Sequence, residues 1–420
     1  MKQDFKRESP SSNTDLGSPS PVILLYTVYF IYFFCGLTQC FEGVFLPEFK
    51  EYFHLNYQQQ QYIMFAKNIP FLLAVVIGMF VKRIGYTKCM TVAMLLFSAG
   101  TLALIPGLDA RRYDLVLLAF LVIGIGFNFE IVAGNPMLSA LGPAQASSSR
   151  LNLGNALGAV AQIIAPATLS IIIPVTVVSV RAKIPYMNGI FAALGTVLFV
   201  VAIFTMLTRK IDVAASFQQD AGTLAADEKP ASIWRRPRVV LGFVSIFLIL
   251  GVEAGLFGFY RNYLEDPAIA GLTSHQSQRL FTLYFAVFAA GRLAASWIQK
   301  RIRPSTHLAV NLFGAMACLA VVAFAKGTAA VVAVTLIGFF VSIFFPTLYA
   351  LAIKNLGDLT GPASGLLTMG FVGCALIPVL QGRIADAVGL QYSYVIGLAG
   401  YLFASFYTLS VAGDRNWIRK

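Results

Sequence analysis

Nine ionisable side chains lie inside long apolar stretches of this sequence, where a charged group is costly to place. They are Glu42, Lys67, Glu130, Glu253, Arg261, Arg279, Arg292, Arg383 and Asp386. In the middle of a bilayer, an ionised side chain costs at least ~2.5 kcal/mol on insertion scales. A functional role is therefore the first hypothesis for each embedded charge.

Glu130 lies at the centre of FLVIGIGFNFEIVAGNPMLSALG, roughly midway along its apolar run. A carboxyl group in apolar surroundings resists ionisation, so it can take up and release a proton near neutral pH. The alternative is a structural carboxylate that a neighbouring cation neutralises. We expect Glu130 to be the first candidate for proton or cation coupling, followed by Glu42 and Glu253.

Lys67, in the segment AKNIPF, is the candidate ion-pair partner of either Glu42 or Glu130. A permanent pair would keep the carboxylate ionised and would oppose a role as proton carrier. Breaking the pair would instead be part of gating. The sequence leaves both partners and both roles open.

Amide side chains within the apolar runs are candidates for binding a substrate, because they hydrogen-bond to hydroxyl groups as donors and as acceptors. They are Gln39, Asn68, Asn128, Asn135, Asn155, Gln162, Asn262 and Gln381. We expect Arg261 to extend toward the membrane interface. Arg383 and Asp386 are three residues apart on one helix face, a spacing that favours an ion pair between them.

A third group of residues is expected to serve gating or structure. It comprises Lys82, Arg83, Arg292, Lys300, Arg301, Pro136 and Pro346. We expect the two prolines, in Asn135-Pro136 and Phe345-Pro346, to interrupt their helices, since proline lacks the backbone N–H and bends a helix.

The elements that position these residues are predicted from composition. The chain has 420 residues, of which 58% are hydrophobic and 12% charged, and this composition favours lipid surroundings over water. A helix needs about 20 apolar residues to cross a bilayer. Twelve such runs are present, at roughly 22–48, 60–81, 89–108, 114–141, 151–175, 185–207, 238–263, 276–299, 306–325, 328–353, 362–385 and 392–412. We expect an all-α membrane protein with twelve transmembrane helices.

Polar segments divide the chain into parts. We expect a disordered cytoplasmic tail at 1–21, a six-helix bundle at 22–207, a cytoplasmic loop at 208–237, a second six-helix bundle at 238–412 and a short cytoplasmic tail at 413–420. Of the 31 Lys and Arg residues, 20 fall on the side of the two termini, six on the opposite side and five within the runs. By the positive-inside rule, both termini are cytoplasmic. The net charge of +12 is thereby a topology signal and requires no nucleic-acid partner.

The two halves repeat at an offset of about 211 residues. KRI at 82–84 corresponds to KRI at 300–302, NPMLSAL at 135–141 to FPTLYAL at 345–351, and GAVAQIIAP at 158–166 to GFVGCALIP at 370–378. Glu42 corresponds to Glu253. Four matches in the same order predict a duplicated six-helix unit around a site near the midplane, an architecture typical of secondary transporters.

Several stretches resemble the fucose:proton symporter family of the major facilitator superfamily. They include LPEFKEYFHLNYQQ at 46–59, LGVEAGLFGFYRNYL at 250–264 and SGLLTMGFVGCALIPVLQGRIADAVG at 364–389. The resemblance implies the superfamily fold with two pseudo-symmetric halves, and transport of a monosaccharide. It also implies that an acidic residue ahead of an Asn-Pro pair handles the sugar and the proton. Glu130 lies five residues before Asn135, whereas the family position, four before, holds Ile131.

The sequence therefore predicts an importer of a hexose or related sugar, driven by protons, in the inner membrane of a bacterium. Alternatives are a sodium-coupled symporter, a uniporter, a carrier of an anionic compound and a sugar sensor that does not transport. We expect a monomer in a lipid bilayer, with no metal site, no cofactor beyond the coupling ion and no nucleic-acid partner. Enzymatic activity is not expected, because the histidines lie near loops and no nucleotide-binding GxxxxGK[ST] is present.

Overall fold

The computed structural model describes residues 21–413 except 142–146, 175, 178, 208–235, 300, 355 and 357–359. The polar segments expected at 1–21, 208–237 and 413–420 lie almost wholly outside the described residues. The first helix begins at Pro21 and the last ends at Gly413. Within this described part the structure is helical throughout, as the sequence predicts.

The first half consists of α1 (Pro21–Val44), α2 (Leu46–Tyr52), α3 (Tyr57–Asn68), the 3-10 turn η1 (Ile69–Leu73), α4 (Ala74–Ile84), α5 (Tyr86–Asp109), α6 (Tyr113–Ala140), α7 (Ser147–Ile172) and α8 (Val180–Leu207). The second half consists of α10 (Pro237–Glu265), α11 (Ser274–Ile298), α12 (Pro304–Phe324), α13 (Gly327–Val341), α14 (Phe344–Ile353), α15 (Thr360–Thr368), the 3-10 turn η7 (Met369–Val372), α16 (Gly373–Val388), α17 (Leu390–Ser393) and α18 (Val395–Gly413).

Ten of these helical rods are long and apolar enough to cross a membrane, when α3–α4, α13–α14 and α15–α16 are each taken as continuous. With α7 and α18 they make the twelve membrane-length rods of the described chain. The twelve-helix architecture is thereby confirmed, and the protein is an integral membrane protein.

The second rod of each half begins with the same local structure. Asn56 accepts a hydrogen bond from the backbone of Gln59, whose side chain in turn accepts one from the backbone of Asn56. Thr273 and Gln276 form the same capping box at the start of α11. A capping box satisfies two backbone N–H groups that the helix leaves unpaired. The recurrence agrees with the duplication that the sequence predicts.

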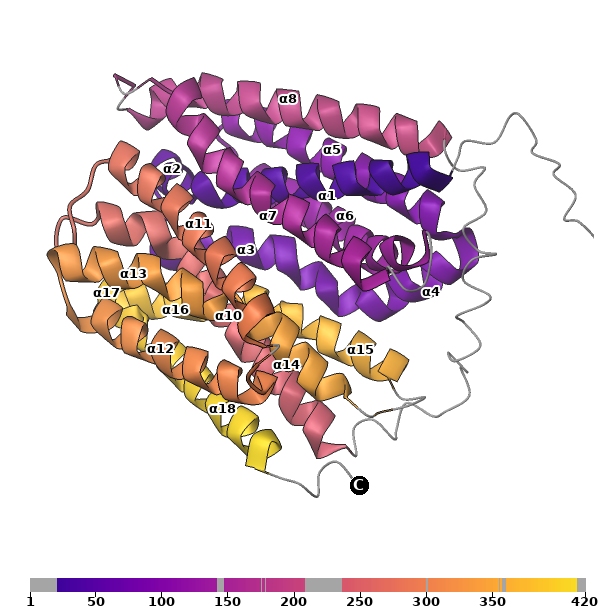
Figure 1. Cartoon of the computed structure of the whole chain (residues 1–420). Helices are drawn as coiled ribbons and strands as arrows, with labels where there is room; N and C mark the ends of the chain where they lie inside the picture. The colour runs from indigo at the N-terminus through magenta and orange to yellow at the C-terminus, as the bar shows by residue number, and fades with distance from the viewer. Residues whose placement is uncertain are drawn as a thin grey trace, which may run out of the picture.

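The two halves lie against each other along two helix pairs, α3 with α16 and α7 with α11. In Figure 1 the first half is drawn in indigo to magenta and the second in pink to yellow. At Gly382 of α16, a Cβ atom would lie 2.8 Å from the Cα of Gln58 on α3. Only glycine permits this close approach, so Gly382 sets the contact between the halves.

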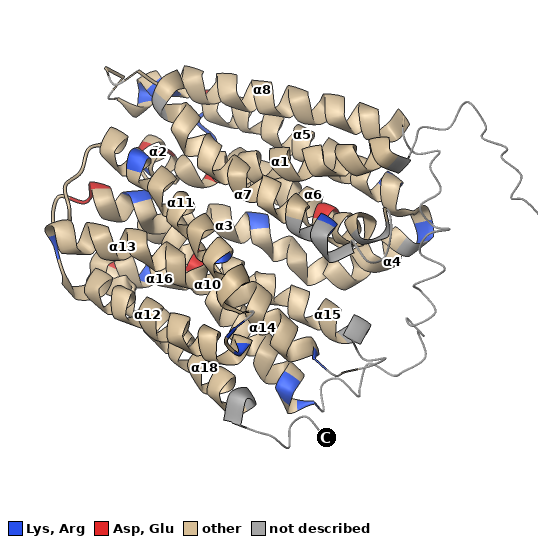
Figure 2. Ribbon diagram, in the orientation of Figure 1, with Lys and Arg blue, Asp and Glu red and all other residues tan. Residues whose placement is uncertain are grey.

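The bundle has two ends, which we name by the elements that they carry. The α2 end carries α2 and α17, and the terminal end carries the start of α1 and the end of α18 (Figure 1). Charged residues are sparse along the helices between these ends, as Figure 2 shows. The few embedded charges are therefore the natural starting point for locating a site.

Candidate coupling and substrate site

An ion pair is buried between α1 and α3. The ammonium group of Lys67 lies 2.6 Å from the Oε2 atom of Glu42, and the two residues are 5% and 1% exposed. At Gly124 on α6, a Cβ atom would lie 2.0 Å from the carbonyl oxygen of Lys67, so this glycine lets α6 approach α3 closely there. Of the two partners left open for Lys67 by the sequence, the structure selects Glu42.

Glu130 lies on α6 and is 3% exposed. Its charge would act on Tyr32 and Cys35 of α1, and Cys35 also lies within the electrostatic range of Glu42 and Lys67. Within the described residues, no cation pairs with Glu130. Burying an ionised carboxylate without a cation is costly, and uptake of a proton removes that cost. The first half thus holds one paired and one unpaired acid in the same region.

The Asn-Pro pair follows Glu130 by little more than one helical turn. The Oδ1 atom of Asn135 accepts a hydrogen bond of 2.7 Å from the hydroxyl group of Tyr32, which joins α6 to α1. The expectation that Pro136 interrupts its helix is wrong, because α6 continues through it to Ala140. A proline removes one backbone hydrogen bond, and a helix of this length retains enough of the others. At the second proline, Pro346, the rod does break, between α13 and α14.

Asn128 lies on α6 beside the 3-10 turn η1. Its Nδ2 group donates a hydrogen bond of 2.5 Å to the carbonyl oxygen of Pro70. The other atom of the amide, Oδ1, is buried and has no hydrogen-bond partner in the described part of the chain. Asn68 instead donates to the carbonyl oxygen of Met64 in its own helix, at 2.8 Å. The Oδ1 atom of Asn128 is therefore a buried acceptor that is free for a ligand. The Nδ2 group of Asn68 is already hydrogen-bonded within its own helix.

The other amides named from the sequence fall into two groups. Gln39 on α1 and Gln162 on α7 are partly exposed, and the Cys40 thiol donates to the carbonyl oxygen of Gln162, so the two amides lie on facing helices. Asn155, also on α7, is exposed.

Asn262 and Gln381 are held at the α2 end. Asn262 accepts a hydrogen bond of 2.8 Å from Gln60, and Gln381 donates to Ser393 of α17 at 3.4 Å. The structure does not bring these two amides to the neighbourhood of Glu130.

In the second half, Glu253 of α10 is partly buried and interacts electrostatically with Arg292 of α11. The two do not form a direct ion pair. The Nε group of Arg292 donates instead to the carbonyl oxygen of Ser342 at 3.2 Å. Glu253 is thus a third embedded acid, with a more distant cation than Glu42 has.

Two of the basic residues expected to serve gating, Arg83 and Arg301, lie near the terminal end. Arg83 is exposed at the end of α4, and the guanidinium group of Arg301 lies 3.9 Å from the ring centroid of Trp297. Lys300 and the side chain of Lys82 lie outside the described part of the structure.

Two 3-10 turns meet between the halves, a feature that the sequence analysis missed. The rings of Phe71 in η1 and Phe371 in η7 stack with centroids 4.9 Å apart and an interplanar angle of 20°. Phe127 and Phe345 extend this aromatic contact on either side. The ammonium group of Lys67 lies 5.9 Å from the ring of Phe127, so the aromatic contact adjoins the buried ion pair.

A cluster of four charged residues, hereafter the charge cluster, joins the halves at the α2 end. Glu48 of α2 lies 2.7 Å from Arg261 of α10 and 3.2 Å from Lys183 of α8, and Arg261 also lies 2.8 Å from Glu265. Arg261 is only 4% exposed, so the expectation that it extends to the membrane interface is wrong. The two carboxylates provide the charge compensation that the interface would otherwise supply.

The electrostatic state of Glu48 follows from its surroundings. Burial alone would raise the pKa of Glu48, but Arg261 and Lys183 outweigh burial and hold the pKa below its ordinary value. Glu48 is therefore ionised at neutral pH. The signal in the sequence was an acid directly after Pro47 in a segment that joins two spans.

A second link between the halves lies beside the charge cluster. Both carboxylate oxygens of Asp386 accept hydrogen bonds from the backbone N–H groups of Tyr57 and Gln58, at 2.8 and 2.9 Å. The expected ion pair with Arg383 is therefore wrong. The start of α3 offers two unpaired N–H groups and the positive end of a helix dipole, and these satisfy Asp386 instead. Together with the charge cluster, this link keeps the α2 end closed in the present structure.

Comparison with known proteins places this geometry in a family. Residues 28–378 match the Major Facilitator Superfamily. The chain belongs to the Major Facilitator Superfamily. The match spans both halves and includes Glu42, Lys67, Glu130 and Glu253.

Individual relatives within the superfamily are sugar transporters by name. The chain is 31% identical over 388 residues to a protein of Brucella abortus (strain 9-941) named glucose/galactose transporter, covering 92% of this chain and 93% of the relative. It is 26% identical over 396 residues to the L-fucose-proton symporter of Escherichia coli (strain K12), covering 88% and 87%. The resemblance to the fucose:proton symporter family is thereby confirmed.

Solved structures agree on the fold. A crystal structure of the E. coli fucose:proton symporter superposes with a TM-score of 0.68 at 22% identity, covering 94% of this chain and 99% of that one. A bacterial homologue of the human lysosomal transporter Spinster, in an inward-facing and occupied conformation, gives a TM-score of 0.69 at 15% identity, covering 94% and 98%. At these identities the likeness establishes the fold alone.

Proposed function

We propose that this protein imports a monosaccharide, a hexose or a related sugar, together with a proton. Relatives named as glucose/galactose transporter and L-fucose-proton symporter, matched over most of their length, support the proposal. Bacterial relatives and the excess of Lys and Arg on the side of the termini favour the inner membrane with cytoplasmic termini. We propose a carrier without catalytic activity that functions as a monomer.

One observation carries the assignment of the proton. Glu42 and Glu130 are both buried in the first half, but among the described residues only Glu42 has a cation within ion-pair distance, Lys67. In this proposal the ion pair keeps Glu42 charged, and the unpaired Glu130 takes up and releases the transported proton. The sugar and proton then move together because the empty, ionised site is costly to close.

The sugar is proposed to bind among the amides near Glu130. The unpaired Oδ1 atom of Asn128 is the kind of buried acceptor that a sugar hydroxyl group satisfies, and leaving such an atom unpaired costs about 1–3 kcal/mol. Gln39 and Gln162, on facing helices, would supply further hydrogen bonds. Phe127, three residues before Glu130 on α6, offers an apolar ring 5.9 Å from the ammonium group of Lys67.

Alternating access would use the links at the α2 end. With cytoplasmic termini, the α2 end faces outward, and the present structure holds it closed through Glu48, Arg261 and Asp386. Uptake requires these links to open once per cycle, after which the halves separate at the α2 end and close at the terminal end.

Transport into proteoliposomes tests the proposal. The purified protein is reconstituted, and accumulation of labelled glucose, galactose and fucose is measured under an imposed pH gradient and then under a sodium gradient. We expect the pH gradient to drive accumulation and the sodium gradient to have no effect. Accumulation driven by sodium would replace the proton in the proposal, and equal rates without any gradient would mean uniport. Competition only by sugar acids would indicate an anionic substrate.

A further inference from the structure

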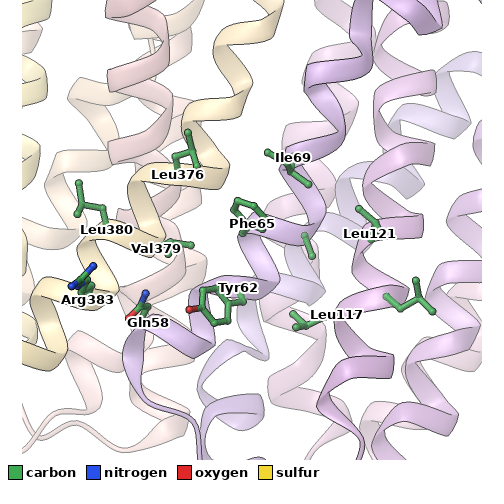
Figure 3. A pocket seen from close by; sticks show the side chains of 12 residues that line it. Gln58, Tyr62, Phe65, Ile69, Leu117, Leu121, Leu376, Val379, Leu380 and Arg383 are labelled. Atoms are coloured by element: carbon green, nitrogen blue, oxygen red, sulfur yellow. The ribbon is translucent and has the colours of Figure 1, made fainter.

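A groove of about 800 Å³ runs along the membrane-spanning surface between α3, α6 and α16. Figure 3 shows its lining, with Leu376 and Ile69 toward one end and Arg383 and Gln58 at the other. This volume lies within the range of small-molecule sites in proteins. The walls come from both halves, since α16 belongs to the second half and α3 and α6 belong to the first.

The walls and the end of the groove differ in chemistry. The walls are aliphatic and aromatic, among them Phe65, Leu121 and Val379. The end that carries Arg383 lies near the start of α3 and the end of α16, where the rods reach the membrane interface at the α2 end. The apolar groove therefore leads from the membrane interior to the guanidinium group of Arg383, at the level of the lipid headgroups.

Arg383 is available to a ligand. It is exposed, and it forms no ion pair or hydrogen bond with other residues in the described ranges. Asp386, one turn further along α16, directs both carboxylate oxygens to backbone N–H groups of α3 and does not pair with Arg383. The amide of Gln58 lies at the same end of the groove and adds hydrogen-bonding capacity.

We propose that this groove binds a glycerophospholipid with an anionic headgroup. The phosphate group pairs with Arg383, whose planar guanidinium group matches phosphate oxygens in a bidentate geometry. One acyl chain lies along the wall of Phe65, Leu121 and Val379. A sugar does not fit this groove, because the lining residues other than Gln58, Tyr62 and Arg383 are apolar and would leave most of its hydroxyl groups without hydrogen bonds. The inference is thus independent of the proposed transport function.

The structure also predicts how binding of the lipid depends on the conformation of the protein. The groove exists in a state in which α3 and α16 are joined at Gly382 and Asp386. When the halves separate at the α2 end, its two walls move apart. A lipid in the groove therefore binds the state with a closed α2 end in preference to the other.

Native mass spectrometry of the full-length protein tests the site. The protein is solubilised from vesicles of equal phosphatidylglycerol and phosphatidylcholine, and the retained lipids are counted. The wild type is expected to retain one phosphatidylglycerol in preference to phosphatidylcholine. Arg383→Gln is expected to weaken retention of phosphatidylglycerol about fivefold, the usual effect of one arginine on an anionic headgroup. Arg279→Gln, an exposed arginine at a similar depth on α11, is the matched control and is expected to change nothing.

A second pair of variants tests the groove itself. Val379→Trp fills the apolar groove from α16 and leaves Arg383 in place. It is expected to reduce retention of both phosphatidylglycerol and phosphatidylcholine. Leu121→Trp does the same from α6, should the first variant fail to fold. Unchanged retention in a folded tryptophan variant, or an equal loss in Arg279→Gln and Arg383→Gln, would overturn the proposal. Spectra showing a lipid-free dimer would also overturn it, because a second copy would then cover the groove.

Discussion

Removing the cation from the buried ion pair gives a prediction with a calculable magnitude. In Lys67→Met, Glu42 remains 1% exposed without its partner at 2.6 Å. Taking one member from a buried pair typically destabilises a protein by about 3–5 kcal/mol. Glu42 can escape this cost by binding a proton. An ordinary glutamate has a pKa near 4.3, so protonating it at pH 7 costs about 3.7 kcal/mol. Because Glu42 can always be protonated at this cost, Lys67→Met should lower the free energy of unfolding by no more than about 3.7 kcal/mol.

The double variant Lys67→Met/Glu42→Gln provides the control. It removes both charges, so no uncompensated carboxylate remains, and we expect it to unfold at a higher temperature than Lys67→Met alone. Thermal unfolding of the wild type, both single variants and the double variant, in one detergent at pH 7, gives the coupling between the residues. A double variant as unstable as the sum of its single variants would refute the reasoning, because the pair would then contribute no mutual stabilisation.

Three further predictions concern the α2 end. Arg261→Gln removes a charged hydrogen bond to Glu48, which contributes about 2 kcal/mol, or about thirtyfold in the equilibrium between the closed and open α2 end. Spin labels on α2 and on the loop after α10 should report longer distances in this variant. Unchanged distances would contradict the role of the charge cluster. Arg261 and Lys183 outweigh burial and depress the pKa of Glu48, so the stabilisation that ionised Glu48 gives to the folded protein is complete above about pH 4.3 and is lost as the pH falls through the lower folded pKa. The same spin labels should give constant distances from about pH 5 to 8 and should separate only at more acidic pH. Opening already at about pH 6 would contradict this assignment. Gly382→Ala places a Cβ atom 2.8 Å from Gln58 and should destabilise the protein by about 1–3 kcal/mol, whereas Gly365→Ala, with open space around it, should not; equal melting temperatures for the two variants would refute the close contact.

The fold was predictable from the sequence because a membrane restricts the options. Apolar runs of about 20 residues and matching segments such as NPMLSAL and FPTLYAL sufficed to predict twelve helices in two halves. The breaks within rods were less predictable. Pro136 leaves α6 continuous, whereas at Pro70 the rod changes from α-helix to the 3-10 turn η1.

The candidate site was predictable in its residues but not in its pairings. Rare embedded charges identified Glu42, Lys67 and Glu130, yet spacing along the chain could not decide which acid lies nearest to Lys67. The distance between helices decides it, and that distance depends on contacts such as Gly124 against the backbone of Lys67. The roles assigned to these residues remain predictions.

Contacts between the halves could not be predicted from the sequence. Arg261 and Asp386 each sit near the end of a span, where an interfacial or local partner is the ordinary expectation. Their actual partners, Glu48 and the start of α3, lie more than two hundred residues away in the chain. Only the tertiary arrangement brings such groups together.

Transport by Glu130→Gln tests the central claim most directly. In proteoliposomes, sugar counterflow without a gradient and accumulation driven by a pH gradient are measured for the wild type, Glu130→Gln and Glu51→Gln, an exposed acid on α2 that serves as control. The proposal predicts that Glu130→Gln retains counterflow and loses accumulation, while Glu51→Gln retains both. Normal accumulation by Glu130→Gln would contradict the assignment of the transported proton to this carboxyl group.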